Sequence, residues 1–316
     1  MKVKFIVLLR KFLVKVGVNI NRQFLCFDIG GKFIKYSVLD QNGQTLQASQ
    51  KVATALQETS NKILEQLESI TREISEETSL AGIAISTAGV VDAQTGSISY
   101  SGYTIPGYTG TPLKQALEEQ FRLPCAVIND VNAACYGEFW KGFPEAGKPQ
   151  SLVCLTIGTG VGGGMILEGE LYSGYSGMAG EIGYLPLKDG LFQDLASTTA
   201  LLKAAQAVEG LELTGEELFE KLTSDANSAY HVVLDNFIES LAEGLLSIIY
   251  LLNPEMIVLG GGIMAQEEIL LPKLTAALEK QVIDKRFLVA QVKAASLGNE
   301  AGMLGALYHL LQSRPE

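Results

Sequence analysis

The chain has 316 residues, enough for about two domains and a substantial core, and its hydrophobic fraction of 47% is ordinary for a soluble globular protein. Its net charge of −11 argues against nucleic acid as a partner, and it contains no run of 18 apolar residues that would span a membrane. The four cysteines are far apart in apolar stretches, which indicates buried thiols in a reducing compartment, the cytoplasm.

The first 22 residues are basic and apolar, but their longest apolar run, Phe5 to Leu9, is too short for the core of a signal peptide. Two interpretations stay open. The segment is either a basic amphipathic stretch that touches membranes or an extension upstream of a fold that begins near Gln23.

In chain order, residues 23–50 predict a β-hairpin with a glycine turn at Gly30-Gly31, followed by a further strand. Apolar residues at helical spacing then predict a helix within 53–77. The pattern continues with four expected elements: strand 81–86, helix 111–121, strand 125–128 and helix 131–140.

The second half opens with another glycine turn, Gly158 to Gly164, which also stands between two strand-like runs. The elements expected after it are helices 198–209 and 228–252, strand 256–259, helix 266–280, strand 287–292 and helix 302–311. Since both halves begin with the same hairpin and continue into α/β structure, the sequence suggests an ancient duplication.

The two glycine turns predict a phosphate-binding function. Glycine lets the backbone approach a ligand closely and direct its N–H groups at phosphate oxygens. The second turn matches G-x-G-x-x-G, but a strand follows it where a dinucleotide-binding fold requires a helix. A Walker-type loop is absent from the sequence. Two hairpin phosphate loops of this kind indicate a nucleotide clamped between two lobes, whereas ordinary hairpin glycines would be the simpler interpretation of either turn alone.

Carboxylates are the candidate catalytic groups, because the only two histidines, His231 and His309, lie in helical stretches away from every motif. Asp130 follows the apolar strand 125–128, and ligand sites in α/β proteins lie at such strand ends. There it can serve as general base for an attacking hydroxyl, although a plain helix N-cap at Asn129 or Asp130 is the alternative. Asp28 ends the first strand and can hold Mg²⁺ against phosphates. Glu181 lies in a loop of small residues that a polar ligand can enter.

Five motifs together resemble the ROK family of bacterial sugar kinases, from about residue 23 to the C-terminus. They are Asp28-Ile-Gly-Gly31, Ser86-Thr-Ala-Gly89, Asn129-Asp130-Val-Asn-Ala-Ala134, Thr156-Ile-Gly-Thr-Gly-Val-Gly-Gly-Gly164 and Gly180-Glu181-Ile-Gly183. The resemblance implies an α/β, actin-like (ribonuclease H-like) two-domain ATPase fold with a nucleotide and sugar cleft. The expected domains are an extension over 1–22, a small α/β domain of 23–127 plus helix 303–316, and a large α/β domain of 128–302.

The resemblance also implies roles for single residues, with ATP and Mg²⁺ as cofactors and a homodimer as the assembly. Asp130 would deprotonate the sugar, and the sugar contacts would come from Gly89, Asn129, Asp130 and Glu181. The nucleotide would lie near Gly30, Gly31, Thr159, Gly160 and Gly261. Lys32 stands where the family usually has Thr, so it either reaches a phosphate or crowds the turn. Lys32 and Lys35 complete the candidate ATP-binding set.

The chain departs from the family at its zinc site. Tyr184 replaces the usual His, and residues 188–197 contain none of the usual cysteines, so we expect no structural zinc. Tyr184 would fill the place of that His and donate its O–H to the sugar. Gln193 stands where the family has its last sugar-contacting Glu.

The joint loss of zinc ligands resembles the zinc-less branch, which includes N-acetylmannosamine kinases and β-glucoside kinases. Residues 82–92 and 103–108 resemble the N-acetylmannosamine branch more closely, and on that basis we predict 6-phosphorylation of this sugar. A glucokinase or β-glucoside kinase is the alternative. From other classes, a sugar- or ATP-binding pseudokinase stays open, whereas the repressors of the family carry a DNA-binding domain that 27 residues before Asp28 cannot supply.

Overall fold

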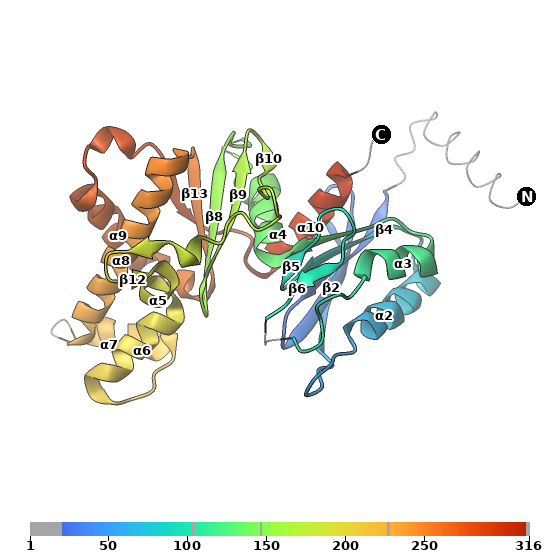
Figure 1. The fold of residues 1–316 in the computed structure, drawn as a ribbon, viewed down its shortest axis with the longest axis horizontal. Coiled ribbons are helices and arrows are strands. Elements are labelled where there is room, and N and C mark those ends of the chain that lie inside the picture. The colour runs from blue at the N-terminus through green and yellow to red at the C-terminus, as the bar shows by residue number, and fades with distance from the viewer. Residues whose placement is uncertain (1–20, 103–104, 146, 226–227, 314–316) are drawn as a thin grey trace, which may run out of the picture. The chain divides into compact units, whose positions relative to one another are not determined.

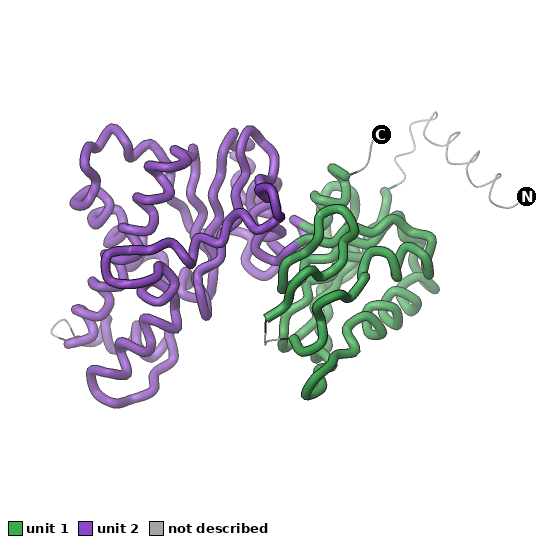
Figure 2. Tube along the Cα trace, in the orientation of Figure 1, with its two compact units in different colours: residues 1–128, 306–316 green, residues 129–305 purple. Residues whose placement is uncertain are grey.

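The computed structural model describes residues 21–102, 105–145, 147–225 and 228–313, so the expected N-terminal extension lies outside the described residues except for its last two positions. The chain forms two compact units (Figure 2). Unit 1 comprises Met1–Ile128 with Ala306–Glu316, and unit 2 comprises Asn129–Gly305.

Unit 1 contains a five-stranded sheet in the order β3-β2-β1-β4-β7. Its strands are β1 (Gln23–Ile29), β2 (Phe33–Asp40), β3 (Thr45–Ala53), β4 (Leu80–Thr87) and β7 (Cys125–Asn129). The first three form an antiparallel meander, and β4 returns parallel to β1. The glycine turn predicted at Gly30-Gly31 is therefore the tight connection between β1 and β2.

Helices α2 (Ile63–Glu77) and α3 (Leu113–Phe121) bury their apolar faces against one side of this sheet. The core there contains Phe27 and Ile29 of β1, whose side chains alternate with Asp28 and so leave Asp28 on the opposite face. That opposite face is approached by α10 (Ala301–Gln312): a Cβ added at Gly82 in β4 would lie 3.0 Å from the Leu310 side chain. The small strands β5 (Val90–Val91) and β6 (Ile98–Tyr100) follow β4.

Unit 2 repeats this strand order. Its sheet runs β10-β9-β8-β13-β14, made of β8 (Leu152–Ile157), β9 (Val161–Leu167), β10 (Glu170–Leu171), β13 (Met256–Gly260) and β14 (Gln291–Ala294). Again the first three strands are antiparallel neighbours, and the fourth is parallel to the first. The matching order in the two units is what the suggested duplication would produce.

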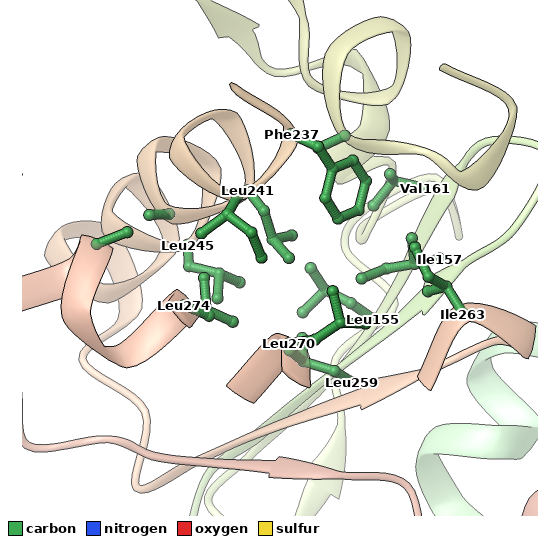
Figure 3. Packing of buried hydrophobic residues seen from close by; sticks show 14 of the residues in the cluster. Leu155, Ile157, Val161, Phe237, Leu241, Leu245, Leu259, Ile263, Leu270 and Leu274 are labelled. Atoms are coloured by element: carbon green, nitrogen blue, oxygen red, sulfur yellow. The ribbon is translucent and has the colours of Figure 1, made fainter. Parts of the chain in front are cut away.

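The helices of unit 2 cover the two faces of its sheet unequally. One face carries the large core of Figure 3, where Leu155 and Ile157 of β8 and Leu259 of β13 pack against helix residues such as Leu241 and Leu270. The helices are α5 (Phe192–Ala196), α6 (Thr198–Glu209), α7 (Gly215–Ser224), α8 (Tyr230–Leu252) and α9 (Glu267–Gln281) (Figure 1). On the other face lies α4 (Asp130–Gly137), which continues into one π turn, η1 (Glu138–Gly142).

The remaining short elements of unit 2 connect these layers. They are η2 (Ile182–Tyr184), β11 (Pro186–Leu187), β12 (Gly190–Leu191), η3 (Gly262–Gln266), η4 (Lys285–Phe287) and η5 (Gly298–Glu300). In the part of the chain that the structure describes, no helix combines the length and the apolar character that a membrane crossing requires.

Two predicted elements differ from the observed ones. The helix expected within 53–77 begins only at Ile63, because residues 55–62 form a turn in which the Lys62 N–H donates to the Ala55 carbonyl. The last strand is 291–294 and not 287–292, because Phe287 belongs to η4, where the Asp284 carboxylate accepts from the Arg286 N–H. Helix α7 was not predicted, although its start carries a capping box formed by Thr214 and Glu217.

Candidate active site

The first glycine turn, in unit 1, is fixed by hydrogen bonds from two sides. The Gly30 N–H donates to the Phe33 carbonyl at 3.0 Å and closes the hairpin. Thr54, which follows β3, donates its hydroxyl to the Gly30 carbonyl at 2.7 Å. Gly31 is half-buried and Lys32 is exposed, so the lysine extends from a rigid turn into solvent and does not crowd it.

Asp28 precedes this turn and has two side-chain partners. The Ser86 hydroxyl of β4 donates to Asp28 Oδ1 at 2.9 Å, and Lys35 Nζ of β2 lies 3.7 Å from Asp28 Oδ2. The carboxylate is therefore held in one orientation beside the glycine turn. One carboxylate that leaves room for phosphate oxygens suits Mg²⁺, which proteins commonly bind through one or two carboxylates together with a nucleotide.

The second glycine turn joins β8 to β9 in unit 2 and lies against the beginning of α6. The Gly158 N–H donates to the Gly160 carbonyl at 2.9 Å, and the Thr198 N–H donates to the Gly158 carbonyl at 3.0 Å. Ser197 caps α6 by accepting from the Ala200 N–H at 3.1 Å. The exposed Thr159 thus stands next to a helix N-terminus, whose N–H groups and dipole favour an anion.

Gly261 lies in the turn after β13, against the end of β8. Its φ of +102° lies in the range that favours glycine, and a Cβ at this position would overlap the Ile157 carbonyl. The turn after β13 can therefore pass directly over the end of β8 only with glycine here.

A cavity of about 560 Å³ opens between these segments of unit 2. Its volume is within the range of small-molecule sites. It is lined by Gly158, Thr159, Thr198, Thr199, Leu201, Leu202, Thr214, Gly215, Glu216, Phe219, Gly262, Ile263, Ala265 and Gln266. The walls from α6 and α7 were missed in the sequence. The available signals were the Ser-Thr-Thr run at 197–199 and the capping box at Thr214.

Asn129 and Asp130 are brought together at the start of α4, in the same unit. Asn129 Oδ1 accepts from the Val131 and Asn132 N–H groups at 3.0 and 3.2 Å, so Asn129 is the helix cap. Asp130 Oδ1 accepts from Asn129 Nδ2 at 3.0 Å and from the Val131 N–H at 2.9 Å. The carboxylate is thereby fixed through one oxygen at the end of β7.

The glycines of β9 separate α4 from the Glu181 loop. A Cβ at Gly162 or Gly164 would lie 2.8 Å from side-chain atoms of Val131 and Cys135 respectively, both on α4. Gly163, between them, faces the opposite way, toward Gly180 and Ile182. Glu181 is exposed, and Tyr184 is 60% exposed on η2.

Two further positions that the sequence singled out, Gly89 and Gln193, are defined by close contacts. Gly89 in unit 1 has a φ of +97°, and a Cβ there would lie 2.8 Å from the Tyr100 carbonyl oxygen. In unit 2, Gln193 Oε1 lies 2.9 Å from a Cβ placed on Gly160 and 3.1 Å from one on Gly183. Gln193 therefore connects the second glycine turn with the segment that carries Glu181 and Tyr184.

Two units whose sheets share one strand order, and whose sheets each begin with a glycine hairpin, define the actin-like ATPase fold that the sequence predicts. The family model described as "ROK family" matches residues 24–313, so the chain belongs to the ROK family, and the predicted fold class is confirmed.

Known proteins resemble the chain over nearly its whole length. An uncharacterized protein of Clostridium perfringens is 40% identical, with 92% of this chain and 98% of that protein covered. A β-glucoside kinase of Listeria monocytogenes is 34% identical, with 90% and 96% covered. The solved structure of a proposed N-acetylmannosamine kinase from L. monocytogenes is 30% identical, with 92% and 99% covered and a TM-score of 0.79.

Proposed function

We propose that this protein is an ATP-dependent sugar kinase that phosphorylates N-acetylmannosamine at its 6-hydroxyl. The observation that carries the kinase proposal lies within unit 2. A cavity of nucleotide size adjoins the second glycine turn, and the same unit holds Asp130 at a strand end with its carboxylate fixed by Asn129. The named relatives, which include a β-glucoside kinase and a glucokinase, support phosphoryl transfer to a sugar.

We expect nucleotide-binding residues in each of the two glycine turns. In unit 2, the adenosine of ATP would occupy the cavity beside Thr159, Gly160 and Gly261. In unit 1, Asp28, Gly30, Gly31 and Lys32 would act at the phosphates, and Lys35, predicted with them from the sequence, would act through Asp28. Contact of one nucleotide with both turns stays a prediction. Mg²⁺, when bound with the nucleotide beside Asp28, neutralises phosphate charge.

Asp130 would act as the general base. Its carboxylate accepts the proton of the 6-hydroxyl, the sugar oxygen bonds to the γ-phosphorus, and the bond from that phosphorus to the bridging oxygen breaks to release ADP. Asn129 would help to hold the reacting hydroxyl. Gly89, Glu181 and Tyr184 would contact the sugar, with the exposed Glu181 carboxylate accepting from hydroxyl groups.

The particular sugar rests on similarity. The resemblance of residues 82–92 and the proposed N-acetylmannosamine kinase at 30% identity favour N-acetylmannosamine. A β-glucoside kinase is the second candidate, because the relative with that activity is 34% identical over 90% of this chain. A homodimer in a reducing compartment, without nucleic acid as a partner, completes the proposal. The four buried free thiols fit that compartment.

The decisive experiment is ADP release measured with a panel of N-acetylmannosamine, N-acetylglucosamine, glucose, mannose and cellobiose. We expect the highest kcat/KM with N-acetylmannosamine and a much lower value with mannose, which lacks the acetamido group. A higher kcat/KM with glucose or cellobiose would show that the proposed substrate is wrong, whereas the proposal of a sugar kinase would stand. If no sugar stimulates ADP release, the protein is a pseudokinase and the proposal is wrong.

A further inference from the structure

A polar row crosses the unit 1 sheet beside the first glycine turn. In the strand register, Asp28 of β1 is paired with Ser86 of β4 on one side and with Lys35 of β2 on the other. Lys35 is in turn paired with Lys51 of β3. The alternating neighbours Phe27 and Ile29 are core residues, so the sheet itself fixes which side chains meet Asp28.

The two oxygens of Asp28 are used differently. Oδ1 accepts from the fully buried Ser86 hydroxyl at 2.9 Å, which fixes the rotation of the carboxylate. Oδ2 then faces Lys35 Nζ at 3.7 Å. The side chains of Lys35 and Asp28 are only 31% and 24% exposed, so bulk water screens this pair incompletely.

Lys51 does not share in this contact. Its Nζ lies 5.1 Å from the centre of the Phe33 ring, within the distance at which a cation interacts with an aromatic face. One lysine of the row is thus directed at the aspartate, and the other is held by an aromatic ring.

We infer that Lys35 is a built-in counter-cation of Asp28, which stands in for the charge of Mg²⁺ when no metal is present. The inference rests on the proposed nucleotide site. In it, Lys35 influences the nucleotide through Asp28 and makes no contact of its own with the phosphates. Without metal, Lys35 shields the incoming phosphates from the negative charge of Asp28. When Mg²⁺ arrives with the nucleotide, the metal assumes this function and Lys35 becomes dispensable.

A direct phosphate contact by Lys35 would give a different result, which makes the inference testable. A phosphate ligand strengthens binding of ADP and of Mg–ADP alike. A counter-cation strengthens only the metal-free binding, so its loss raises the dependence of ADP affinity on Mg²⁺. Metal and nucleotide affinities are linked, and the ratio of the two ADP dissociation constants measures their coupling.

The experiment is calorimetric titration of the full chain with ADP, in EDTA and in excess Mg²⁺, for wild type and Lys35→Met. We expect Lys35→Met to weaken ADP binding in EDTA about fivefold or more. This is the effect of about 1 kcal/mol of repulsion between two unit charges about 4 Å apart in water, here the uncompensated Asp28 carboxylate and a phosphate oxygen. The affinity for ADP in excess Mg²⁺ should stay within about twofold of the wild-type value. The ratio of the dissociation constant in EDTA to that in Mg²⁺ therefore rises about fivefold. Lys35→Arg keeps the charge and should keep the wild-type ratio.

Lys51→Met is the matched control, because it removes a lysine of the same row that does not face Asp28, and its ratio should equal that of wild type. If Lys35→Met weakens ADP binding equally in EDTA and in Mg²⁺, Lys35 contacts the phosphates directly and the inference is wrong. A wild-type affinity that is the same in EDTA and in Mg²⁺ would overturn it as well. Neither result would disprove the kinase proposal, which depends on sugar-stimulated ADP release.

Discussion

Asn129 and Asp130 are neighbours in the chain, but their side chains make different hydrogen bonds. Asn129 satisfies two N–H groups at the start of α4, which is the ordinary function of a helix cap. Asp130 is the first residue of α4, where its carboxylate accepts from Asn129 Nδ2 and from the Val131 N–H. Through its bond with the Val131 N–H, Asp130 also contributes to this helix start, and its function as general base stays a prediction.

The first prediction concerns Asp130→Asn. Loss of the base should reduce kcat by about 10²-fold or more, the usual contribution of base catalysis, and should leave the affinity for Mg–ADP within about twofold. Steady-state kinetics with the best sugar of the panel and calorimetry with ADP measure the two effects. A variant that keeps more than about a tenth of the wild-type kcat would exclude Asp130 as the base.

The second prediction concerns the pH dependence of stability through His309. Burial, with a smaller contribution from the nearby Lys114 charge, lowers the pKa of His309 to about 4 in the folded state. The unfolded chain, with the ordinary pKa near 6.5, therefore binds more protons between pH 6.5 and 4, and the free energy of unfolding falls as pH falls through that range. Between pH 7 and pH 5 we expect a loss of about 2 kcal/mol from this group.

Urea unfolding of wild type and His309→Gln at both pH values isolates this contribution, because other titrating groups affect both proteins. The variant should lose about 2 kcal/mol less than wild type on acidification. Equal losses in the two proteins would show that His309 titrates normally.

At the level of elements, each sheet places a glycine hairpin at the end of its first strand. In unit 2 the hairpin is further enclosed by the N-terminus of α6 and the turn at Gly261. These segments are separated by about 40 and 100 residues in the chain, and only the parallel pairing of β13 with β8 brings Gly261 to Ile157.

The third prediction follows from that contact. Gly261→Ala must accommodate both a positive φ and an overlap with the Ile157 carbonyl, so we expect it to destabilise unit 2 by about 2–4 kcal/mol and to impair ADP binding. Gly262→Ala is the matched control for stability without ADP, because no protein atom lies within 4 Å of a Cβ at that position, although Gly262 lines the cavity. Thermal unfolding with and without ADP compares the two variants, and similar melting temperatures would contradict the prediction.

For the whole molecule, the predicted absence of structural zinc concerns the state of the cysteines and the metal-ligating side chains. The four cysteines are buried, and burial raises the pKa of the Cys154 thiol to about 12, which disfavours the thiolate that zinc requires. In the described ranges, no cluster of three or more His, Cys, Asp or Glu side chains is arranged to hold a metal ion.

The fourth prediction is therefore that the purified protein contains no stoichiometric zinc and that chelation leaves its melting temperature unchanged. Elemental analysis and a thermal melt in EDTA provide the two measurements. About one zinc per chain, or a melting temperature that falls by several degrees in EDTA, would show that another ligand set has replaced the family site.

The sequence alone determined the fold class, most elements and the positions of both glycine turns, because strand periodicity and glycine spacing are local properties of the chain. It did not reveal the true start of α2, because the turn at 55–62 is fixed by hydrogen bonds such as that from the Lys62 N–H to the Ala55 carbonyl. It also left α7 unrecognised, although the capping box at Thr214 marks its start. Only the tertiary structure revealed that α6 and α7 wall the cavity, that Gln193 lies between Gly160 and Gly183, and that Ser86 and Lys35 hold Asp28. Those relations join residues of distant segments, and strand register and packing, not local propensity, bring them into contact.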